Sequence, residues 1–379
     1  MISSAPGPRL LNWISVFLFL STIGLPLVGT LAGIEGGDEK AENRDLATFP
    51  SFDGTWRSAV EYGEGIDRWF SDHFAFRSRL VQWFGETRYL WLGVSPSPRV
   101  VAGKDSWLFY GEDFSIDDYA NARPFSEFDE ANWRESIVRA RDWLAESGIA
   151  YVFTIAPDKH VIYADEFPES INRVGPMSRM DQLYAAISDT RVVVDLRPAL
   201  SHARVSERLY HRTDTHWNDR GAFAAYQQIV EALRSQAPAV PPAWPRSDFD
   251  EVPSLTDGKD LAGMIGLTHV LREDDLTLVP RRRRLARIVE PIGRDPRAPA
   301  DRVVTEIPGS SLPRAVIFRD SFAGALIPFL SEHFRRAVYV WQNDFDSNLI
   351  RAEHPDVVIQ EIVGRHLYSF VPSPELVPK

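Results

Sequence analysis

The sequence predicts an α/β fold: a mostly parallel sheet with helices on both faces, preceded by one N-terminal transmembrane helix. Two observations support this prediction. Residues 10–34 form one long uncharged apolar run, and from about residue 128 amphipathic helical segments alternate with short segments that are apolar throughout. Strands of continuous apolar character are typical of a parallel sheet buried on both faces. The chain has 379 residues, enough to bury a substantial core.

The apolar run of residues 10–34, LLNWISVFLFLSTIGLPLVGTLAGI, is about as long as a helix that crosses roughly 30 Å of hydrocarbon. Arg9 precedes the run and acidic residues follow it, which favours a cytoplasmic N-terminus, residues 1–9, and export of the rest of the chain. Small residues at 29–33 leave a cleaved signal peptide as the alternative. We favour an uncleaved anchor, because the run is longer than the usual core of a signal peptide.

The segment after the anchor, residues 35–50, is polar and acidic, and we expect it to be a tether. Order is expected to resume in one domain, residues 51–379. Its first part, residues 51–127, has apolar and aromatic residues at helical spacing and then GKDSWLFYGED, which predicts a turn followed by a short aromatic strand. This part is therefore expected to be a helical and aromatic extension of the domain.

The alternation of helices and strands begins at Asp129, which can cap a helix that ends at Gly148. The apolar segment IAYVFTIAP follows as a buried strand, and a second helix leads to the strand RVVVDL. Asn218 can cap a further helix, GAFAAYQQIVEAL. Three more strands are expected in RAVIFRD, RAVYVWQ and PDVVIQEIV.

Three loops are candidates for the chemistry, because functional groups in parallel sheets gather where loops leave the carboxyl ends of strands. They are APDKHVIY, the segment RTDTHW, and FRDSFAGAL. In the last loop Ser321 is expected at a helix N-terminus, where backbone N–H groups and the helix dipole favour the negative charge of a serine nucleophile and its oxyanion. An ordinary helix cap is the alternative.

Asp214 and His216 are two residues apart, so their side chains share one face of an extended segment. The carboxylate can then orient the imidazole, whose other nitrogen is available to a nucleophile such as Ser321. The pattern predicts a catalytic triad of Ser321, His216 and Asp214. Taken alone, RTDTHW also fits a helix start with a solvated aspartate and a half-buried histidine.

Composition excludes several classes of site. The formal net charge of −11 argues against a nucleic-acid-binding surface. The run Arg281–Arg284 is expected to be a solvated loop or edge, with a site for a polyanionic partner as the alternative. There is no cysteine, which excludes disulfides, thiolate nucleophiles and zinc–thiolate sites. The nine histidines show no spacing typical of metal ligands. We therefore expect neither a metal nor a cofactor.

Further side chains near strand ends are candidates for substrate contacts. Trp217, Trp341 and Gln342 offer aromatic and amide groups that can contact a substrate, although each also fits a core position. Lys159 in APDKHVIY and Arg365 in EIVGRHLY are charged candidates for a substrate or oxyanion role. Lys159 can instead pair with an acidic neighbour.

Two motifs resemble those of SGNH hydrolases. DSF at Asp320–Phe322 resembles the Gly-Asp-Ser nucleophile motif, with Arg319 in place of the glycine, and DTHW resembles the Asp-x-His pair of that superfamily. The order of the two motifs is the reverse of the usual one. Together with the N-terminal anchor, this order and the motifs GKDSWLFY, APDKHVIY, YHRTDTHWNDRGAF, DLAGMIGL and PDVVIQEIV, over roughly residues 50–370, resemble the alginate O-acetyltransferase family of SGNH-like proteins.

The resemblance implies an SGNH-hydrolase-like fold with permuted motif order and O-acetylation of an exported polysaccharide through the triad. It also implies that a membrane-bound O-acyltransferase delivers the acetyl groups, and that a single-pass inner-membrane anchor holds the catalytic domain in the periplasm. Two alternatives stay open: a carbohydrate O-acetylesterase with the same triad, and a non-catalytic subunit of a polysaccharide export complex. The motifs identify no oxyanion-hole group beyond the Ser321 N–H.

Overall fold

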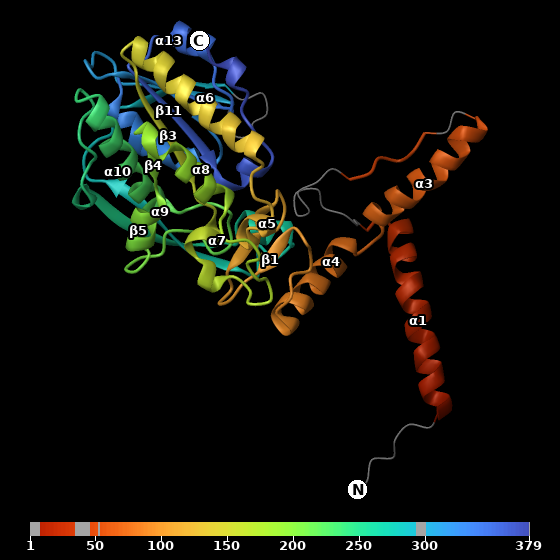
Figure 1. Ribbon diagram of the computed structural model, residues 1–379. Helices are drawn as coiled ribbons and strands as arrows, with labels where there is room; N and C mark the ends of the chain where they lie inside the picture. Colours follow the sequence, from red (N-terminus) through yellow and green to blue (C-terminus); the bar gives the residue numbers. More distant parts are fainter. Residues whose placement is uncertain (1–7, 35–45, 52–53, 293–300, 379) are drawn as a thin grey trace. The chain divides into compact units, whose positions relative to one another are not determined.

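The computed structural model describes residues 8–34, 46–51, 54–292 and 301–378 (Figure 1). The chain divides into two units: one contains residues 1–97 and 262–270, the other residues 98–261 and 271–379. Most of the predicted tether, residues 35–50, and most of the predicted cytoplasmic segment, residues 1–9, lie outside the described residues. The boundary between the units at residue 97 falls inside the extension predicted for residues 51–127.

The first unit is helical. It begins with α1 (Pro8–Leu31), which agrees with the predicted span of residues 10–34. Within α1 the stretch Asn12–Thr30 is long and apolar enough to cross a membrane. The helices that follow are α3 (Trp56–His73), α4 (Arg77–Glu86) and the π-helical continuation of α4, η1 (Thr87–Trp91).

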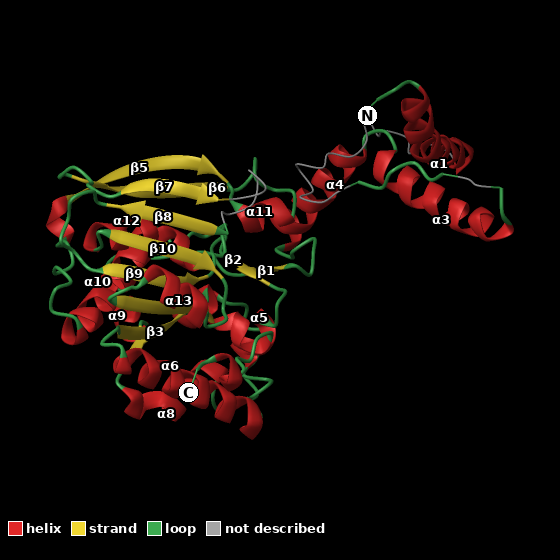
Figure 2. Ribbon diagram, turned by 90° about the horizontal axis from the view of Figure 1, so that it is seen from above, coloured by secondary structure: helices red, strands yellow, loops and turns green. Residues whose placement is uncertain are grey.

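The second unit is built on a seven-stranded sheet with the order β4-β3-β11-β9-β10-β8-β7 (Figure 2). The first five strands are parallel, and they are β4 (Val193–Asp195), β3 (Ala150–Ala156), β11 (Val357–Val363), β9 (Arg314–Arg319) and β10 (Arg336–Trp341). Two antiparallel strands, β8 (Arg302–Glu306) and β7 (Arg287–Ile292), complete it. The α/β class is confirmed, and the sheet is mixed.

The sequence did not predict the antiparallel strands, because RVVTE and RIVEPI carry charges and lack a continuous apolar run. Strands at an antiparallel edge can leave one face to solvent and need no such run. Ile288 on β7, for example, is exposed. By contrast, every residue of β3 and β11 is buried, as expected of central strands covered on both faces.

The two faces of the sheet are covered by different helices. One core cluster joins Val152 of β3 and Ile359 of β11 to the apolar side of α10 (Asp219–Gln236). The other joins Tyr151, Phe153 and Val358 to α6 (Glu127–Glu146) and α8 (Arg179–Ile187). Neighbouring strand residues point to opposite faces, so one apolar strand contributes to both clusters.

The helix caps were partly predicted. Asn218 caps α10, since its side chain accepts hydrogen bonds from the N–H groups of Arg220 and Gly221. The prediction that Asp129 caps α6 is wrong: Ser126 is the cap, and its hydroxyl accepts the N–H of Asp129 in the first turn. The predicted stop at Gly148 is confirmed by its φ of +70°, a conformation that suits glycine.

Shorter elements complete the unit. They are the hairpin strands β1 (Val100–Ala102) and β2 (Leu108–Tyr110), the ribbon strands β5 (Phe249–Asp257) and β6 (Arg272–Pro280), and the helices α5 (Ser115–Ala120), α7 (Lys159–Ile162), α9 (Arg197–Ala203), α11 (Asp260–Met264), α12 (Ile327–Leu330) and α13 (Ser347–Glu353). There are also 3-10 turns: η2 (Ala164–Glu166), η3 (Ser188–Thr190), η4 (Arg246–Asp248), η5 (Phe322–Leu326), η6 (Ser331–His333), η7 (Gly364–Tyr368) and η8 (Pro374–Leu376).

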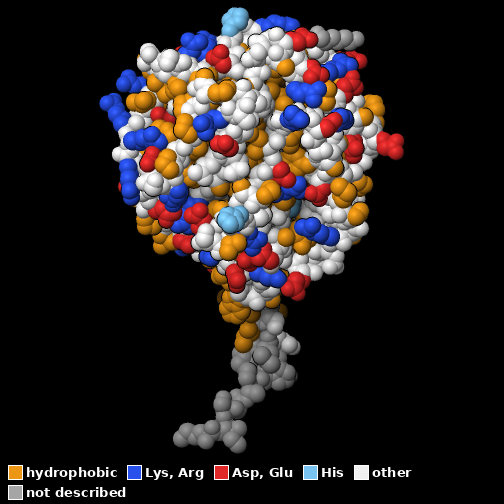
Figure 3. Space-filling view, turned by 60° about the vertical axis from the view of Figure 1, so that its left-hand side comes forward, with side chains coloured by type: hydrophobic (Ala, Val, Ile, Leu, Met, Phe, Trp, Pro, Cys, Tyr) orange, Lys and Arg blue, Asp and Glu red, His pale blue; other side chains and the backbone are white. Residues whose placement is uncertain are grey.

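Charged side chains of both signs are interspersed on the face drawn in Figure 3. In the arginine run, Arg281 pairs with Asp250 and Arg282 pairs with Asp248. These ion pairs at the surface agree with the solvated edge predicted for the run, whereas Arg284 is half-buried and donates to the Pro328 carbonyl. The carboxylates of Asp250 and Asp248 neutralise part of the positive charge that would be needed to bind a polyanion.

Candidate active site

Ser321 lies two residues after the end of β9, at the edge of the sheet where β3, β10 and β11 also end. It is half-buried and opens the 3-10 turn η5, with φ −66° and ψ −32°. The α-helix predicted here is reduced to this turn and the four-residue α12, where Pro328 lacks the N–H that a longer helix would use. Among the described residues, the Ser321 hydroxyl has no hydrogen-bond partner.

Asp214 and His216 form a hydrogen-bonded pair, as their spacing predicted. His216 Nδ1 lies 2.7 Å from Asp214 Oδ1, and the His216 N–H donates to the same oxygen at 3.0 Å. Burial alone would raise the pKa of Asp214, but the hydrogen bonds and charge of His216 hold that pKa below its ordinary value. An ionised carboxylate only accepts hydrogen bonds, so Nδ1 carries the proton and Nε2 is left as an acceptor.

The loops of His216 and Ser321 are in contact through Phe322. The His216 ring packs on the Phe322 ring with centroids 4.9 Å apart, and Trp217 Nε1 donates to the Phe322 carbonyl at 3.0 Å. His216 Nε2 is buried and has no hydrogen-bond partner in the described part of the chain. The structure therefore brings the loops of the predicted base and the predicted nucleophile together, without a hydrogen bond between Ser321 Oγ and His216 Nε2. Such bonds are often long in free enzymes and tighten on substrate binding.

Lys159 forms hydrogen bonds with the backbone of the loop that carries His216. Its Nζ donates to the carbonyls of His211 at 2.9 Å, Arg212 at 3.1 Å and Asp214 at 2.6 Å, and the residue is only 3% exposed. Burial lowers the pKa of Lys159 to about 7. Three carbonyl acceptors match the three N–H donors of an ammonium group. This placement favours a role in holding the loop over a contact with substrate.

Two carboxylates that the sequence did not single out hold the same loop. Glu273 of β6 is fully buried and accepts the N–H groups of Arg212 at 3.1 Å and Thr213 at 2.8 Å. Asp260 accepts the N–H of Thr215 at 2.9 Å and its hydroxyl at 2.7 Å. The loop is thus fixed through its N–H and carbonyl groups, which keeps the Asp214–His216 pair in one geometry.

Asp214, His216 and Asp260 also form the one group in the described residues whose atoms could together hold a metal ion, within 4.8 Å of one another. Burial and the nearby Asp214 charge raise the pKa of Asp260. Both Asp260 oxygens already accept from Thr215, and Asp214 Oδ1 accepts from His216. These hydrogen bonds explain why the side chains of Asp214, His216 and Asp260 lie close together.

Asp320, next to Ser321 in sequence, connects the Ser321 turn to β11. Its carboxylate accepts the N–H of Phe322 at 2.9 Å and of Val363 at 2.5 Å, and its own N–H donates to Glu361 Oε2 at 3.1 Å. Burial, followed by the Asp320 charge, raises the pKa of Glu361 well above its ordinary value. Burial thus favours the neutral form of Glu361, which bonds the Asp320 N–H beside the Ser321 turn and which the sequence did not indicate.

Glu361→Gln tests this protonation state. A group whose pKa is raised by folding stabilises the fold at low pH, and that contribution is lost as the pH rises. Glutamine keeps an acceptor for the Asp320 N–H but cannot ionise. The melting temperature of the variant, relative to wild type, should therefore increase between pH 5 and pH 8. A difference that stays constant over this range would contradict a neutral Glu361.

The other predicted site residues lie at the same sheet edge with different surroundings. Trp217 and Arg365 are 1% and 7% exposed, and Arg365 pairs with Asp158 at 2.6 Å. Trp341 is half-buried beneath the Arg319 guanidinium, 4.4 Å from the ring centroid, and Gln342 donates to the Asp344 carbonyl. Burial favours a positioning role for Trp217 and Arg365, whereas acceptor contact at Trp341 and Gln342 stays a prediction.

Lys159→Met should destabilise the protein by about 2–4 kcal/mol, because three carbonyls of the loop lose the buried amine that donates to them. Chemical denaturation measures the loss. The matched control is Lys104→Met, which removes an exposed lysine that pairs with Glu169 and should change stability little. Equal effects of the two substitutions would show that Lys159 does not hold the loop.

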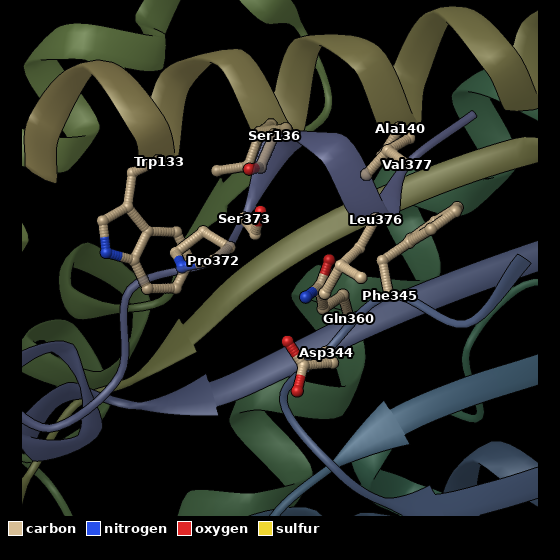
Figure 4. A pocket seen from close by; sticks show the side chains of 11 residues that line it. Trp133, Ser136, Ala140, Asp344, Phe345, Gln360, Pro372, Ser373, Leu376 and Val377 are labelled. Atoms are coloured by element: carbon tan, nitrogen blue, oxygen red, sulfur yellow. The ribbon is translucent and has the colours of Figure 1, made fainter. Parts of the chain in front are cut away.

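Two cavities differ in what they can accommodate. The cavity shown in Figure 4, between Trp133 and Ser136 of α6 and the C-terminal segment, has a volume of about 10 Å³. That is room for about one water molecule. A cavity of about 490 Å³ lies beside the His216 loop, lined by Arg208, Arg212 and the β5–β6 ribbon. Its volume is typical of small-molecule sites, roughly 300–1,000 Å³.

Known proteins share both sequence and fold with this chain. The family model described as SGNH hydrolase-like domain, acetyltransferase AlgX, matches residues 100–292. The probable alginate O-acetylase AlgJ of Pseudomonas syringae pv. tomato is 36% identical over 146 residues, 37% of this chain and 35% of its own length. That of Azotobacter vinelandii is 24% identical over 218 residues, 56% and 53% of the two chains. This chain thus spans from about a third to half of the length of these relatives.

The solved structure of Bacillus cereus PatB1 is similar in fold, with a TM-score of 0.51 at 15% identity over 71% of this chain and 96% of that one. The match of the family model covers Asp214 and His216 and includes half of the chain, which confirms the resemblance inferred from the motifs. The chain belongs to the family of the SGNH hydrolase-like domain, acetyltransferase AlgX.

Proposed function

We propose that the chain is an O-acetyltransferase that acetylates an exported polysaccharide through an acetyl-enzyme formed on Ser321. The observation that carries the proposal is the Asp214–His216 pair, whose Nε2 is unpartnered in the described residues and whose ring packs on Phe322, next to Ser321. Membership of the AlgX family and similarity to relatives named alginate O-acetylases support the reaction type.

In the first half-reaction Ser321 Oγ attacks the carbonyl carbon of a donor acetyl group while His216 Nε2 takes the serine proton. The tetrahedral intermediate collapses, and His216 returns the proton to the departing donor oxygen. In the second half-reaction His216 takes the proton of a sugar hydroxyl, which attacks the acetyl-serine. Ser321 then leaves with the proton from His216, and the acetylated sugar is released.

Asp214 keeps His216 in the reactive tautomer throughout both steps. Its hydrogen bond to Nδ1 fixes the ring, and its negative charge stabilises the imidazolium that forms in each half-reaction. The supports from Lys159, Glu273 and Asp260 keep Asp214 in place, so little reorganisation is needed when the charge develops.

We further propose that α1 anchors the chain in the inner membrane, with residues 1–9 cytoplasmic and the catalytic domain, residues 51–379 with their extension 51–127, in the periplasm. The apolar stretch of α1 supports the anchor. A membrane-bound O-acyltransferase would supply acetyl groups across the same membrane, and the anchor would hold the catalytic domain near it. The acceptor is a polysaccharide of the kind named for the relatives, an alginate.

Product analysis tests the proposal against hydrolysis. The purified chain is incubated with an activated acetyl ester, with and without oligosaccharides, and the sugars and free acetate are quantified by mass spectrometry. A transferase yields acetylated sugar at the expense of acetate. Release of acetate alone, with all oligosaccharides offered, would identify a carbohydrate O-acetylesterase instead. The absence of any turnover would favour a non-catalytic subunit.

A further inference from the structure

The helical stretch of α4 and η1 carries an exposed apolar ridge, which we define as Trp83, Phe84, Leu90, Trp91 and Leu92. The two tryptophans are mostly exposed to solvent: Trp83 is 67% exposed and Trp91 is 83% exposed. The opposite side of α4 is occupied within the same unit. Gly85 is buried on that side, where a Cβ added to it would lie 3.2 Å from the Ile265 carbonyl oxygen. The side chains of Gln82 and Glu86 form hydrogen bonds with His269. A ridge this apolar marks a surface that binds a membrane or a partner.

The turn between α3 and α4 packs on the last turn of α1 (Figure 1). The N–H of Ala75 donates to Thr30 Oγ1 at 2.9 Å, and Ala75 is fully buried. A Cβ on Gly29 would lie 2.5 Å from the Ala75 Cβ, so the two segments approach as closely as glycine allows. Thr30 is the last residue of the apolar stretch that could span a membrane. The helix α4 therefore starts at the level where α1 would leave the hydrocarbon.

The composition of α4 and η1 matches a lipid surface. Tryptophan and tyrosine concentrate where membranes meet water, and this stretch contains Trp83, Tyr89 and Trp91. It also carries three arginines against one glutamate, in a chain whose formal net charge is −11. Basic charge beside aromatic and aliphatic side chains is typical of helices that lie in the headgroup region of anionic membranes.

We propose that the apolar ridge inserts into the interfacial region of the bilayer leaflet at which α1 ends, so that α4 and η1 lie on the membrane surface. The occupant of the ridge is lipid. The membrane contact then extends to Leu92, and the second unit begins at residue 98, only a few residues later. The membrane would thus hold the chain at two places, the span in α1 and the ridge.

Site-directed labelling tests the proposal directly, because the chain contains no cysteine. Trp83→Cys and Trp91→Cys variants of the full chain are labelled with an environment-sensitive fluorophore and reconstituted in vesicles of zwitterionic and anionic lipids. The matched control is Val205→Cys, an apolar residue that is 86% exposed in the second unit. Nitroxide groups placed near the lipid headgroups and iodide in the buffer serve as the two quenchers.

We expect lipid-borne nitroxide to quench the labels at positions 83 and 91 and leave the label at 205 bright. Iodide should quench position 205 several-fold more strongly than the other two. Equal iodide quenching at all three positions, without lipid quenching, would overturn the proposal. Protection from iodide without lipid quenching would also overturn it, because protein would then cover the ridge, and dependence of that protection on protein concentration would identify a second copy.

Discussion

Ser321→Ala should abolish acetyl transfer while leaving the melting temperature within a few degrees of wild type. The hydroxyl makes no hydrogen bond to any described residue, so its removal costs the folded state little. The proposed chemistry loses its nucleophile, because Ser321 is the serine that precedes Phe322, whose ring packs on the His216 ring. Transfer rates measured with an activated acetyl ester, together with thermal melts of both proteins, check this expectation.

The matched control is Ser126→Ala, which removes the hydroxyl that caps α6. Loss of a cap costs about 1 kcal/mol, or about 2–4 °C in a domain of this size. This variant should therefore melt earlier than wild type and retain its activity. Ser321→Ala should therefore lose activity and keep its melting temperature, whereas Ser126→Ala should keep its activity and melt at a lower temperature. Full activity of Ser321→Ala would eliminate the acetyl-enzyme mechanism.

Asp214→Asn should lower the transfer rate by orders of magnitude, about 10⁴-fold by comparison with serine triads in which the orienting aspartate is replaced. An asparagine side chain can donate to His216 Nδ1 and so favour the tautomer in which Nε2 carries the proton. That tautomer cannot accept the Ser321 proton. The pKa of Asp214 lies below its ordinary value, so the carboxylate is ionised at neutral pH in wild type and the substitution removes a full charge.

Asp219→Asn serves as the control for this charge change. Asp219 lies in the first turn of α10, and its carboxylate accepts the N–H of Leu278 at 2.8 Å, whereas that of Asp214 bonds His216. Its replacement should leave the rate close to wild type. His216→Ala should be about as damaging as Ser321→Ala, and the double variant little worse than either, because members of one catalytic unit are not additive. A rate for Asp214→Asn similar to that for Asp219→Asn would contradict the proposed role of Asp214.

The α/β class and the position of the candidate site could be predicted because they depend on local patterns. Apolar strands such as residues 150–156 are recognisable over a few residues, and the loops at their ends follow from the sheet. The pairing of Asp214 with His216 also needs only an i, i+2 spacing. Such features are encoded within a short window of the chain.

The supports of the site could not be predicted, because they join distant parts of the chain. Lys159 bonds carbonyls more than 50 residues later, and Glu273 bonds N–H groups about 60 residues earlier. An aspartate or glutamate within a charged stretch such as RED gives no sign that it is buried. The antiparallel strands β7 and β8 were missed for a related reason. They are held by pairing of β8 with β10 and of β7 with β8, and their own sequences lack the continuous apolar run of a buried strand.

The most direct test of the central claim is to find the acetyl group on the enzyme. The full chain is mixed with an activated acetyl ester, quenched with acid after short times, digested, and the peptides are sequenced by mass spectrometry. We predict an acetyl adduct on Ser321 that forms in wild type, is absent from His216→Ala, and disappears when oligosaccharide is added as acetylated sugar accumulates. Acetylated sugar formed with no adduct on Ser321 at any time, or an adduct on another residue that transfers its acetyl group, would contradict the account.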